Sequence, residues 1–88
     1  TRRSSDLIGH TTAAITDIKC VFSMAIRLKA ASIIIVHNHP SGRVKPSEED
    51  RKLTKDMKVA GEILNIPLLD HIIIGAGRYY SFSEEGKI

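Results

Sequence analysis

A run of β-branched residues at positions 32–37 (SIIIVH) most constrains how this chain can fold. Continuous apolar runs are typical of central strands buried on both faces, whereas half-exposed strands alternate apolar and polar residues. A second run, residues 68–74 (LLDHIII), has the same character and is closed by a Gly-Ala-Gly turn. We therefore expect two buried strands, with Pro67 ending the connection that precedes the second strand.

The segments around these strands show helical periodicity. Thr16 or Asp17 can cap a first helix that ends near Lys29, and its apolar positions are Ile18, Val21, Phe22, Ala25 and Ile26. Ser47 starts a second helix, whose inner face is expected to carry Leu53, Met57, Ala60 and Leu64.

Shorter strands complete the expected order. Residues 1–12 are interpreted as the tail of a strand whose beginning lies outside this chain, and residues 79–82 as a third short strand. The alternation of helices and strands indicates the α/β class, with ligands at the carboxyl end of a strand. At 88 residues the chain is at most one small domain, and a larger parent protein is expected.

Composition limits the class of protein and the compartment in which it is expected. A hydrophobic fraction of 42% with 26% charged residues is ordinary for a soluble globular domain. Neither a membrane span nor a signal peptide is expected, because no apolar run is long enough. The single cysteine, Cys20, excludes an internal disulfide, fits a reducing cytoplasm and is interpreted as a buried structural thiol.

The net charge of +3 is mild, and the basic residues alternate with acidic ones. Arg43, Lys45, Arg51, Lys52, Lys55 and Lys58 are interleaved with Glu48, Glu49, Asp50 and Asp56. Such mixing is typical of a solvated helix face and not of a phosphate-binding stripe. DNA contact through these residues is expected to be weak.

The segment that carries chemistry reads H-x-H, seven residues, then S-x-x-D. His37 and His39 lie two residues apart at a strand end, so their side chains point to the same face while Asn38 points away. Zinc accepts imidazole nitrogen and carboxylate oxygen, and three protein ligands leave a position for water. Asp50 is the natural third ligand, and Zn²⁺ is the expected metal.

Other interpretations of these residues remain open. The two histidines could be hydrogen-bonded to backbone, and Ser47 with Asp50 fits the spacing of a capping box, which alone would explain both. Ser47 could also hold an oxyanion, since a cap and a first-turn donor are compatible.

Structural roles are expected for two further groups of residues. Asp70 and His71 are expected to form a satisfied polar pair at a strand end, with a supporting role behind metal ligands as the alternative. Tyr79, Tyr80 and Phe82 are expected to contribute core and edge packing.

The chain resembles the RadC family, whose members carry a JAMM (MPN-type) metallopeptidase-like domain. The likeness rests on residues 37–42 (HNHPSG), 46–50 (PSEED) and 69–75 (LDHIIIG), with residues 79–82 beyond, and it spans about residues 9–86. It implies a three-layer α/β/α fold similar to cytidine deaminases. It also implies that residues 1–88 form the carboxy-terminal part of one such domain, without its first strands.

The resemblance also implies site roles. His37, His39 and Asp50 would bind zinc, and Ser47 would steady the reacting oxygen. The family's general-base glutamate has no counterpart, because residues 1–36 contain no glutamate. Either the chain begins after this residue, or another residue serves, or the site binds metal without hydrolysing amides.

Two function classes follow. The first is a cytoplasmic zinc-dependent metallohydrolase acting on amide or isopeptide bonds of a peptide or protein substrate. The second, suggested by the traditional RadC description, is a non-enzymatic module of a DNA repair or recombination protein.

Overall fold

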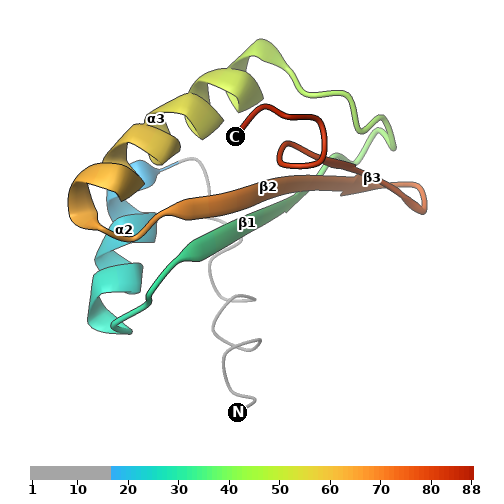
Figure 1. Cartoon of the computed structure of the whole chain (residues 1–88). Helices are drawn as coiled ribbons and strands as arrows, with labels where there is room; N and C mark the ends of the chain where they lie inside the picture. Colours follow the sequence, from blue (N-terminus) through green and yellow to red (C-terminus); the bar gives the residue numbers. More distant parts are fainter. Residues whose placement is uncertain (1–16) are drawn as a thin grey trace.

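The computed structural model describes residues 17–88, so the strand expected within residues 1–12 lies outside the described part. The elements follow one another in the order α2 (Ile18–Arg27), β1 (Ile33–Asn38), α3 (Glu48–Leu64), β2 (Leu68–Gly75) and β3 (Arg78–Ser81) (Figure 1). Each agrees with the element expected from the sequence to within one or two residues at each end. The α/β class is confirmed.

Helix α2 begins where a capping aspartate satisfies its first backbone amides. The Asp17 carboxylate accepts hydrogen bonds from the backbone nitrogens of Lys19 (3.0 Å) and Cys20 (3.3 Å). Of the two N-cap residues that the sequence offered, Asp17 is thus the one used. The helix buries Phe22 and Ala25 in the core, as its periodicity predicted.

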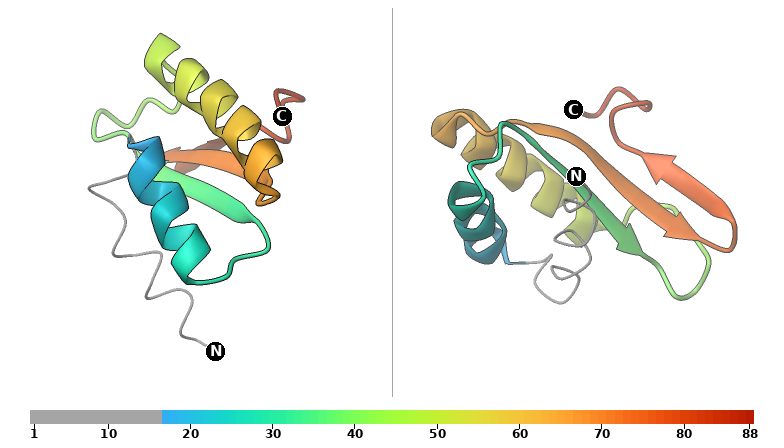
Figure 2. Two further views of the ribbon diagram at one scale, coloured as in Figure 1. Left: turned by 90° about the vertical axis from the view of Figure 1, so that its left-hand side faces the viewer. Right: turned by 90° about the horizontal axis from the view of Figure 1, so that it is seen from below.

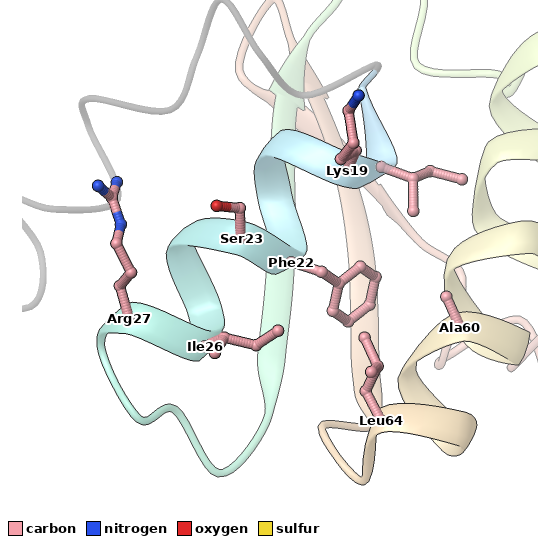
Figure 3. Close-up of a pocket in the computed structure, with 8 residues that line it drawn as sticks. Lys19, Phe22, Ser23, Ile26, Arg27, Ala60 and Leu64 are labelled. Atoms are coloured by element: carbon pink, nitrogen blue, oxygen red, sulfur yellow. The ribbon is translucent and has the colours of Figure 1, made fainter.

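One expectation for α2 is wrong. Cys20 is exposed, and its thiol donates a hydrogen bond to the Asp17 carboxylate (3.2 Å). The reason is helical geometry, because two residues turn the helix by about 200° and place Cys20 opposite the buried Phe22. Ile26 is 53% exposed, since it lines an open apolar groove between α2 and α3 (Figure 3).

Helix α3 carries a complete capping box. The Ser47 hydroxyl accepts from the Asp50 backbone nitrogen (3.0 Å), and the Asp50 carboxylate accepts from the Ser47 nitrogen (2.7 Å). At the other end Asn65 adopts the left-handed conformation, with φ of 60°, and terminates the helix. No helix within residues 17–88 combines the length and apolarity that a bilayer span requires.

The inner face of α3 is largely as expected. Met57 is fully buried, and Leu53 and Ala60 pack against the core. Leu64 is a correction, because it is 44% exposed in the last turn and lines the groove opposite Ile26 (Figure 3). The side chain faces the groove between α2 and α3, where the described residues cover it only in part.

The strands form a sheet in the order β1-β2-β3 (Figure 2). β1 and β2 are parallel and are connected through α3, whereas β2 and β3 are antiparallel and joined by a tight turn. Ala76 and Gly77 both have positive φ in this turn, at 51° and 72°. A one-residue irregularity in the β1-β2 register leaves Leu69 without a partner. The carboxyl ends of β1 and β2 therefore lie side by side.

Strand β1 is buried on one face only, which corrects the expectation of burial on both. Ile35 is 5% exposed and joins Phe22 and Met57 in the core, whereas Ile34 and Val36 are 50% and 43% exposed on the other face. Both described helices contribute to the core on the Ile35 side (Figure 1). Within residues 17–88, two of the expected three layers are thus observed.

The aromatic residues near β3 pack much as expected. Phe82 is 3% exposed and stacks on His71, with ring centroids 4.8 Å apart and planes at 10°. Tyr80 meets Phe82 edge-on, and Tyr79 lies at the exposed edge with its hydroxyl bonded to Glu84. This packing fixes His71 beneath the carboxyl end of the sheet.

Candidate metal centre

The two histidines of the H-x-H segment point to the same side of the sheet. His37 lies within β1, and the His39 nitrogen continues the strand pairing by donating to the Ile74 carbonyl (2.9 Å). Their ring centroids are 4.8 Å apart. Asn38, between them, is exposed on the opposite side, as strand alternation predicted.

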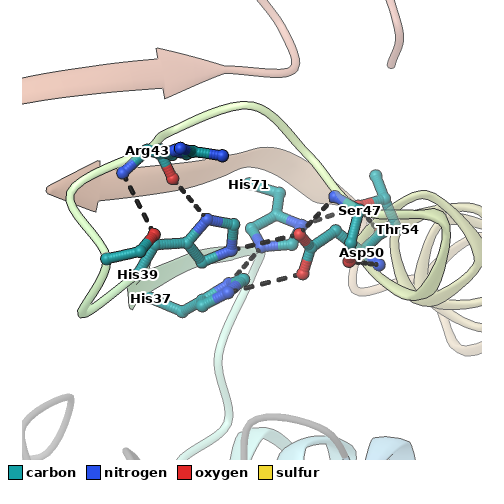
Figure 4. A network of polar contacts seen from close by, with 8 residues as sticks. His37, His39, Arg43, Ser47, Asp50, Thr54 and His71 are labelled. Carbon is teal, nitrogen blue, oxygen red and sulfur yellow. Dashed lines mark hydrogen bonds and ion pairs between the residues drawn. The ribbon is translucent and has the colours of Figure 1, made fainter.

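Asp50 reaches the two imidazoles from the first turn of α3 (Figure 4). One carboxylate oxygen lies 3.4 Å from His37 Nε2, and the other lies 3.2 Å from His39 Nε2. One potential ligand atom from each residue can be chosen so that all lie within 4.8 Å of one another. The structure therefore brings together the three residues that the sequence predicted as ligands.

The hydrogen bond on the far side of His39 determines how its ring faces Asp50. His39 Nδ1 lies 2.7 Å from the Arg43 backbone carbonyl, which can only accept. Nδ1 therefore carries a proton, and in the neutral ring Nε2 presents a lone pair toward the Asp50 carboxylate. Two acceptors that face each other at 3.2 Å repel unless a metal ion lies between them or Nε2 also carries a proton.

The spacing of these atoms fits a divalent metal. Ligands bound to zinc at about 2.0–2.2 Å in tetrahedral geometry lie about 3.3–3.6 Å from one another. The two carboxylate–imidazole distances, 3.4 and 3.2 Å, are close to this range, although they involve different carboxylate oxygens, and one ligand atom from each residue can be chosen so that all lie within 4.8 Å. Two imidazole nitrogens and a carboxylate oxygen also form a donor set that metals such as zinc accept. His37, His39 and Asp50 thus fit metal binding.

Electrostatics favours the metal-ready forms of the ligands. The pKa of His37 lies below its usual 6.5, chiefly because burial disfavours the cation, although Asp50 acts in the opposite direction. Burial by itself would raise the pKa of Asp50, but its hydrogen bonds with Ser47 and the neighbouring imidazoles outweigh burial and lower it. Near neutral pH, His37 is neutral and Asp50 is anionic, as metal ligation requires.

Ser47 lies beside the centre as the N-cap of α3, so the capping interpretation is confirmed. Its oxygen accepts the hydrogen bond from Asp50, and among residues 17–88 its hydroxyl proton has no acceptor. The cap therefore leaves this proton available for a second interaction.

Two glycines let the loop after β1 approach β2 closely. A Cβ atom on Gly75 would lie 3.0 Å from the His39 carbonyl oxygen and 3.1 Å from the Gly42 Cα. Gly42 itself has φ of +82°, a conformation that other residues rarely adopt. The position of His39 thus depends on the absence of a side chain at Gly75.

His71 and Thr54 belong to the centre; the sequence offered this role for His71 only as the alternative to a structural pair with Asp70, and it did not predict it for Thr54. His71 is fully buried, with Nε2 2.9 Å from His37 Nδ1 and Nδ1 2.6 Å from Thr54 Oγ1. Burial and the neighbouring His37 lower the pKa of His71 to about 4, so its ring is neutral near pH 7. A histidine inside an apolar strand was the available signal.

Asp70, in contrast, is a satisfied structural residue as expected. Its carboxylate accepts from the Ser81 hydroxyl (2.6 Å) and from the backbone nitrogens of His71 (2.7 Å) and Ser83 (3.0 Å). Asp70 and His71 therefore have different roles. Asp70 connects β2 to the carboxy-terminal segment, whereas His71 supports the centre.

Fold and site together define a class, namely an α/β domain with an open His-His-Asp centre that fits metal binding. Comparison with known families agrees, because residues 3–87 match the RadC-like JAB domain. The chain belongs to this family, as its resemblance had indicated.

Several bacterial proteins share this domain. The chain is 48% identical over its full length to a UPF0758 protein of Trichlorobacter lovleyi, of which it covers 38%. It is 51% identical over 90% of its length to one from Roseiflexus castenholzii, covering 34% of that protein. A Thermotoga maritima relative is 46% identical over 92% of the chain, which covers 36% of it. The chain thus spans about a third of the length of these curated relatives.

Proposed function

We propose that the chain is part of a zinc-dependent hydrolase that cleaves amide bonds, in a peptide or an isopeptide substrate. The observation that carries this proposal is the convergence of His37, His39 and Asp50, with His39 Nε2 directed at the Asp50 carboxylate (3.2 Å). Three protein ligands leave a coordination position open, which is characteristic of catalytic and not structural zinc sites.

The residues of the centre have separate tasks in this proposal. When bound, zinc would supply a nucleophile at neutral pH and polarise the scissile carbonyl, since it lowers the pKa of its bound water to about 7. His37 is held neutral by burial, and Asp50 is held anionic by Ser47. The chain therefore keeps these two ligands deprotonated without help from the metal.

Ser47 is proposed to donate a hydrogen bond to the oxygen on which negative charge develops. Its Oγ already accepts from the Asp50 nitrogen (3.0 Å), which fixes the hydroxyl beside the metal ligand. A preorganised donor at such a position stabilises the transition state by roughly 3–4 kcal/mol.

The reaction also needs a group that carries a proton to the leaving amine. Asp50 is the acid that residues 17–88 bring to the two imidazoles, and it is already assigned as a ligand. Glu48 bonds to Arg51 on the surface, and Asp70 is occupied by Ser81. The proposal therefore requires a proton carrier from outside residues 17–88.

The test has two parts. Both use the longest natural form of the protein that contains this chain. Metal analysis of protein equilibrated with zinc is expected to give one ion per chain. Hydrolysis of a fluorogenic peptide and of a lysine-linked isopeptide then reports activity, with Asp56→Asn as a control on the same helix. Absence of stoichiometric zinc would overturn the metal centre, and tight zinc without hydrolysis of either substrate would overturn the enzyme assignment.

A further inference from the structure

A series of three hydrogen bonds connects the backbone of α3 to the His37 ring through the protein core (Figure 4). Thr54 Oγ1 lies 2.8 Å from the Asp50 backbone oxygen and 2.6 Å from His71 Nδ1. His71 Nε2 in turn lies 2.9 Å from His37 Nδ1. This series of hydrogen bonds thus begins at one proposed metal ligand, Asp50, and ends at another, His37.

The chemistry of the first bond decides the direction of the others. The Asp50 carbonyl oxygen can only accept, so Thr54 uses its single hydroxyl proton there. The hydroxyl must then accept from His71 Nδ1, which makes Nε2 of the neutral ring an acceptor. His37 Nδ1 must therefore donate to His71, and its Nε2 retains the lone pair.

We infer that Thr54 and His71 are positioning residues that set the tautomer and orientation of His37, so that Nε2 faces Asp50 ready for the metal. This inference rests on the proposed metal centre. The hydrogen-bonded Nδ1 of His37 corresponds to that of His39, which donates to the Arg43 carbonyl instead. Both imidazoles thereby donate through Nδ1, to different partners, and direct Nε2 toward Asp50.

The burial of the two residues supports a role beyond packing. Thr54 is 3% exposed and His71 is fully buried, so water does not compete for their polar atoms. A buried hydroxyl and imidazole carry a desolvation cost that apolar side chains would avoid, such as valine at nearly the volume of threonine or phenylalanine with a somewhat larger ring. The ring of His71 is also clamped against Phe82, with planes at 10°, which limits its rotation.

The direct test observes the tautomer itself. Metal-free full chain labelled with ¹⁵N-histidine is examined near neutral pH by long-range nitrogen–proton NMR, which distinguishes protonated from bare ring nitrogens. His37 is expected to show a proton on Nδ1 and a bare Nε2, and His71 the same arrangement. A His37 ring protonated at Nε2 in the wild type would overturn the inference without any variant having to fold.

A matched pair of substitutions then measures the effect on the metal. Thr54→Val removes the hydroxyl at nearly constant volume, whereas Thr54→Ser keeps it. Loss of a group that orients a ligand typically weakens metal affinity by roughly 10–100-fold. Competition with a chromophoric chelator is therefore expected to show this loss for Thr54→Val and near wild-type zinc affinity for Thr54→Ser. His71→Phe, which leaves His37 Nδ1 without its acceptor, should lose at least as much.

The outcomes separate this inference from the proposed function. A wild-type chain that binds no zinc would overturn the proposed metal centre. Tight zinc in the wild type together with equally tight zinc in Thr54→Val and His71→Phe would overturn only the positioning role. Circular dichroism on each variant confirms that folded protein is compared, and the wild-type tautomer remains decisive if a variant does not fold.

Discussion

Replacing Asp50 with asparagine is expected to remove most of the metal affinity while leaving helix α3 capped. Asparagine keeps an oxygen that can accept from the Ser47 nitrogen, now at 2.7 Å from the carboxylate, but it removes the charge. A structural zinc site is stabilised by roughly 10–16 kcal/mol, which is about 2.5–4 kcal/mol for each of four ligands. Loss of one ligand should therefore weaken binding about 100- to 1,000-fold.

The cost to folding should be much smaller. The substitution exchanges a charge-assisted hydrogen bond for a neutral one at the start of α3, a change of about 0.5–1.5 kcal/mol. Urea unfolding of the metal-free chain measures this loss of folding stability, and chelator competition measures the zinc affinity. In this way the capping and ligand roles of one carboxylate can be separated.

Asp56→Asn is the matched control for this experiment. Asp56 lies further along α3 and pairs with Lys52 on the surface at 2.8 Å, away from the imidazoles. Its loss should cost under about 1 kcal/mol and leave zinc affinity unchanged. If Asp50→Asn bound zinc as tightly as the Asp56→Asn control, the assignment of Asp50 as a ligand would be refuted.

Four further predictions follow from the same contacts. Ser47→Ala should cost about 0.5–2 kcal/mol of stability and, at unchanged zinc content, lower hydrolysis roughly 100-fold; full activity with a lower melting temperature would leave capping as its only role. The pKa of His71 is about 4 in the folded chain and 6.5 unfolded, so its contribution to the stability of the metal-free protein should be fully present above pH 6.5 and be lost toward pH 4, by about 3 kcal/mol; urea unfolding should show a smaller slope for His71→Phe than for the wild type, because His37, whose pKa is also lowered, still titrates in the variant. Gly75→Ala should destabilise the chain by about 1–3 kcal/mol and weaken zinc binding, because its Cβ would press on the His39 carbonyl; chelator competition and thermal unfolding measure both. Binding to a labelled DNA duplex should be weak and vanish near physiological salt, and reversing three basic charges should abolish it, namely Arg43, Lys45 and Arg51; tight binding at that salt would favour a DNA-binding module.

Much of the site could be predicted because its information is local. The H-x-H spacing places both imidazoles on one face of any strand, and the Ser47-Asp50 spacing suits a capping box in any helix. Both features appear in the structure at the expected residues. The residues that make the contact of Asp50 with the histidines also lie within one stretch of the chain, because nine residues (39–47) join β1 to α3.

Exposure could not be predicted in the same way, because it depends on what packs across each surface. Ile34 and Val36 continue an unbroken apolar run, yet they lie on the face away from α2 and α3. Ile26 and Leu64 fit the apolar faces of their helices, yet both line an open groove. Periodicity gives the direction of a side chain, but only the neighbouring element decides whether that direction leads to the core.

The sequence by itself thus determined the elements, the Ser47 cap of α3 and the three proposed ligands, since each depends on residues close together in the chain. The support for His37 was decided by tertiary structure alone. Leu68 and His71 both face the helices, although strict alternation would place residues three apart on opposite faces. The unpartnered Leu69 shifts the register and turns His71 toward His37 and Thr54. A one-residue shift reverses the face of every later side chain, and it arises from the pairing of two strands that are distant in sequence.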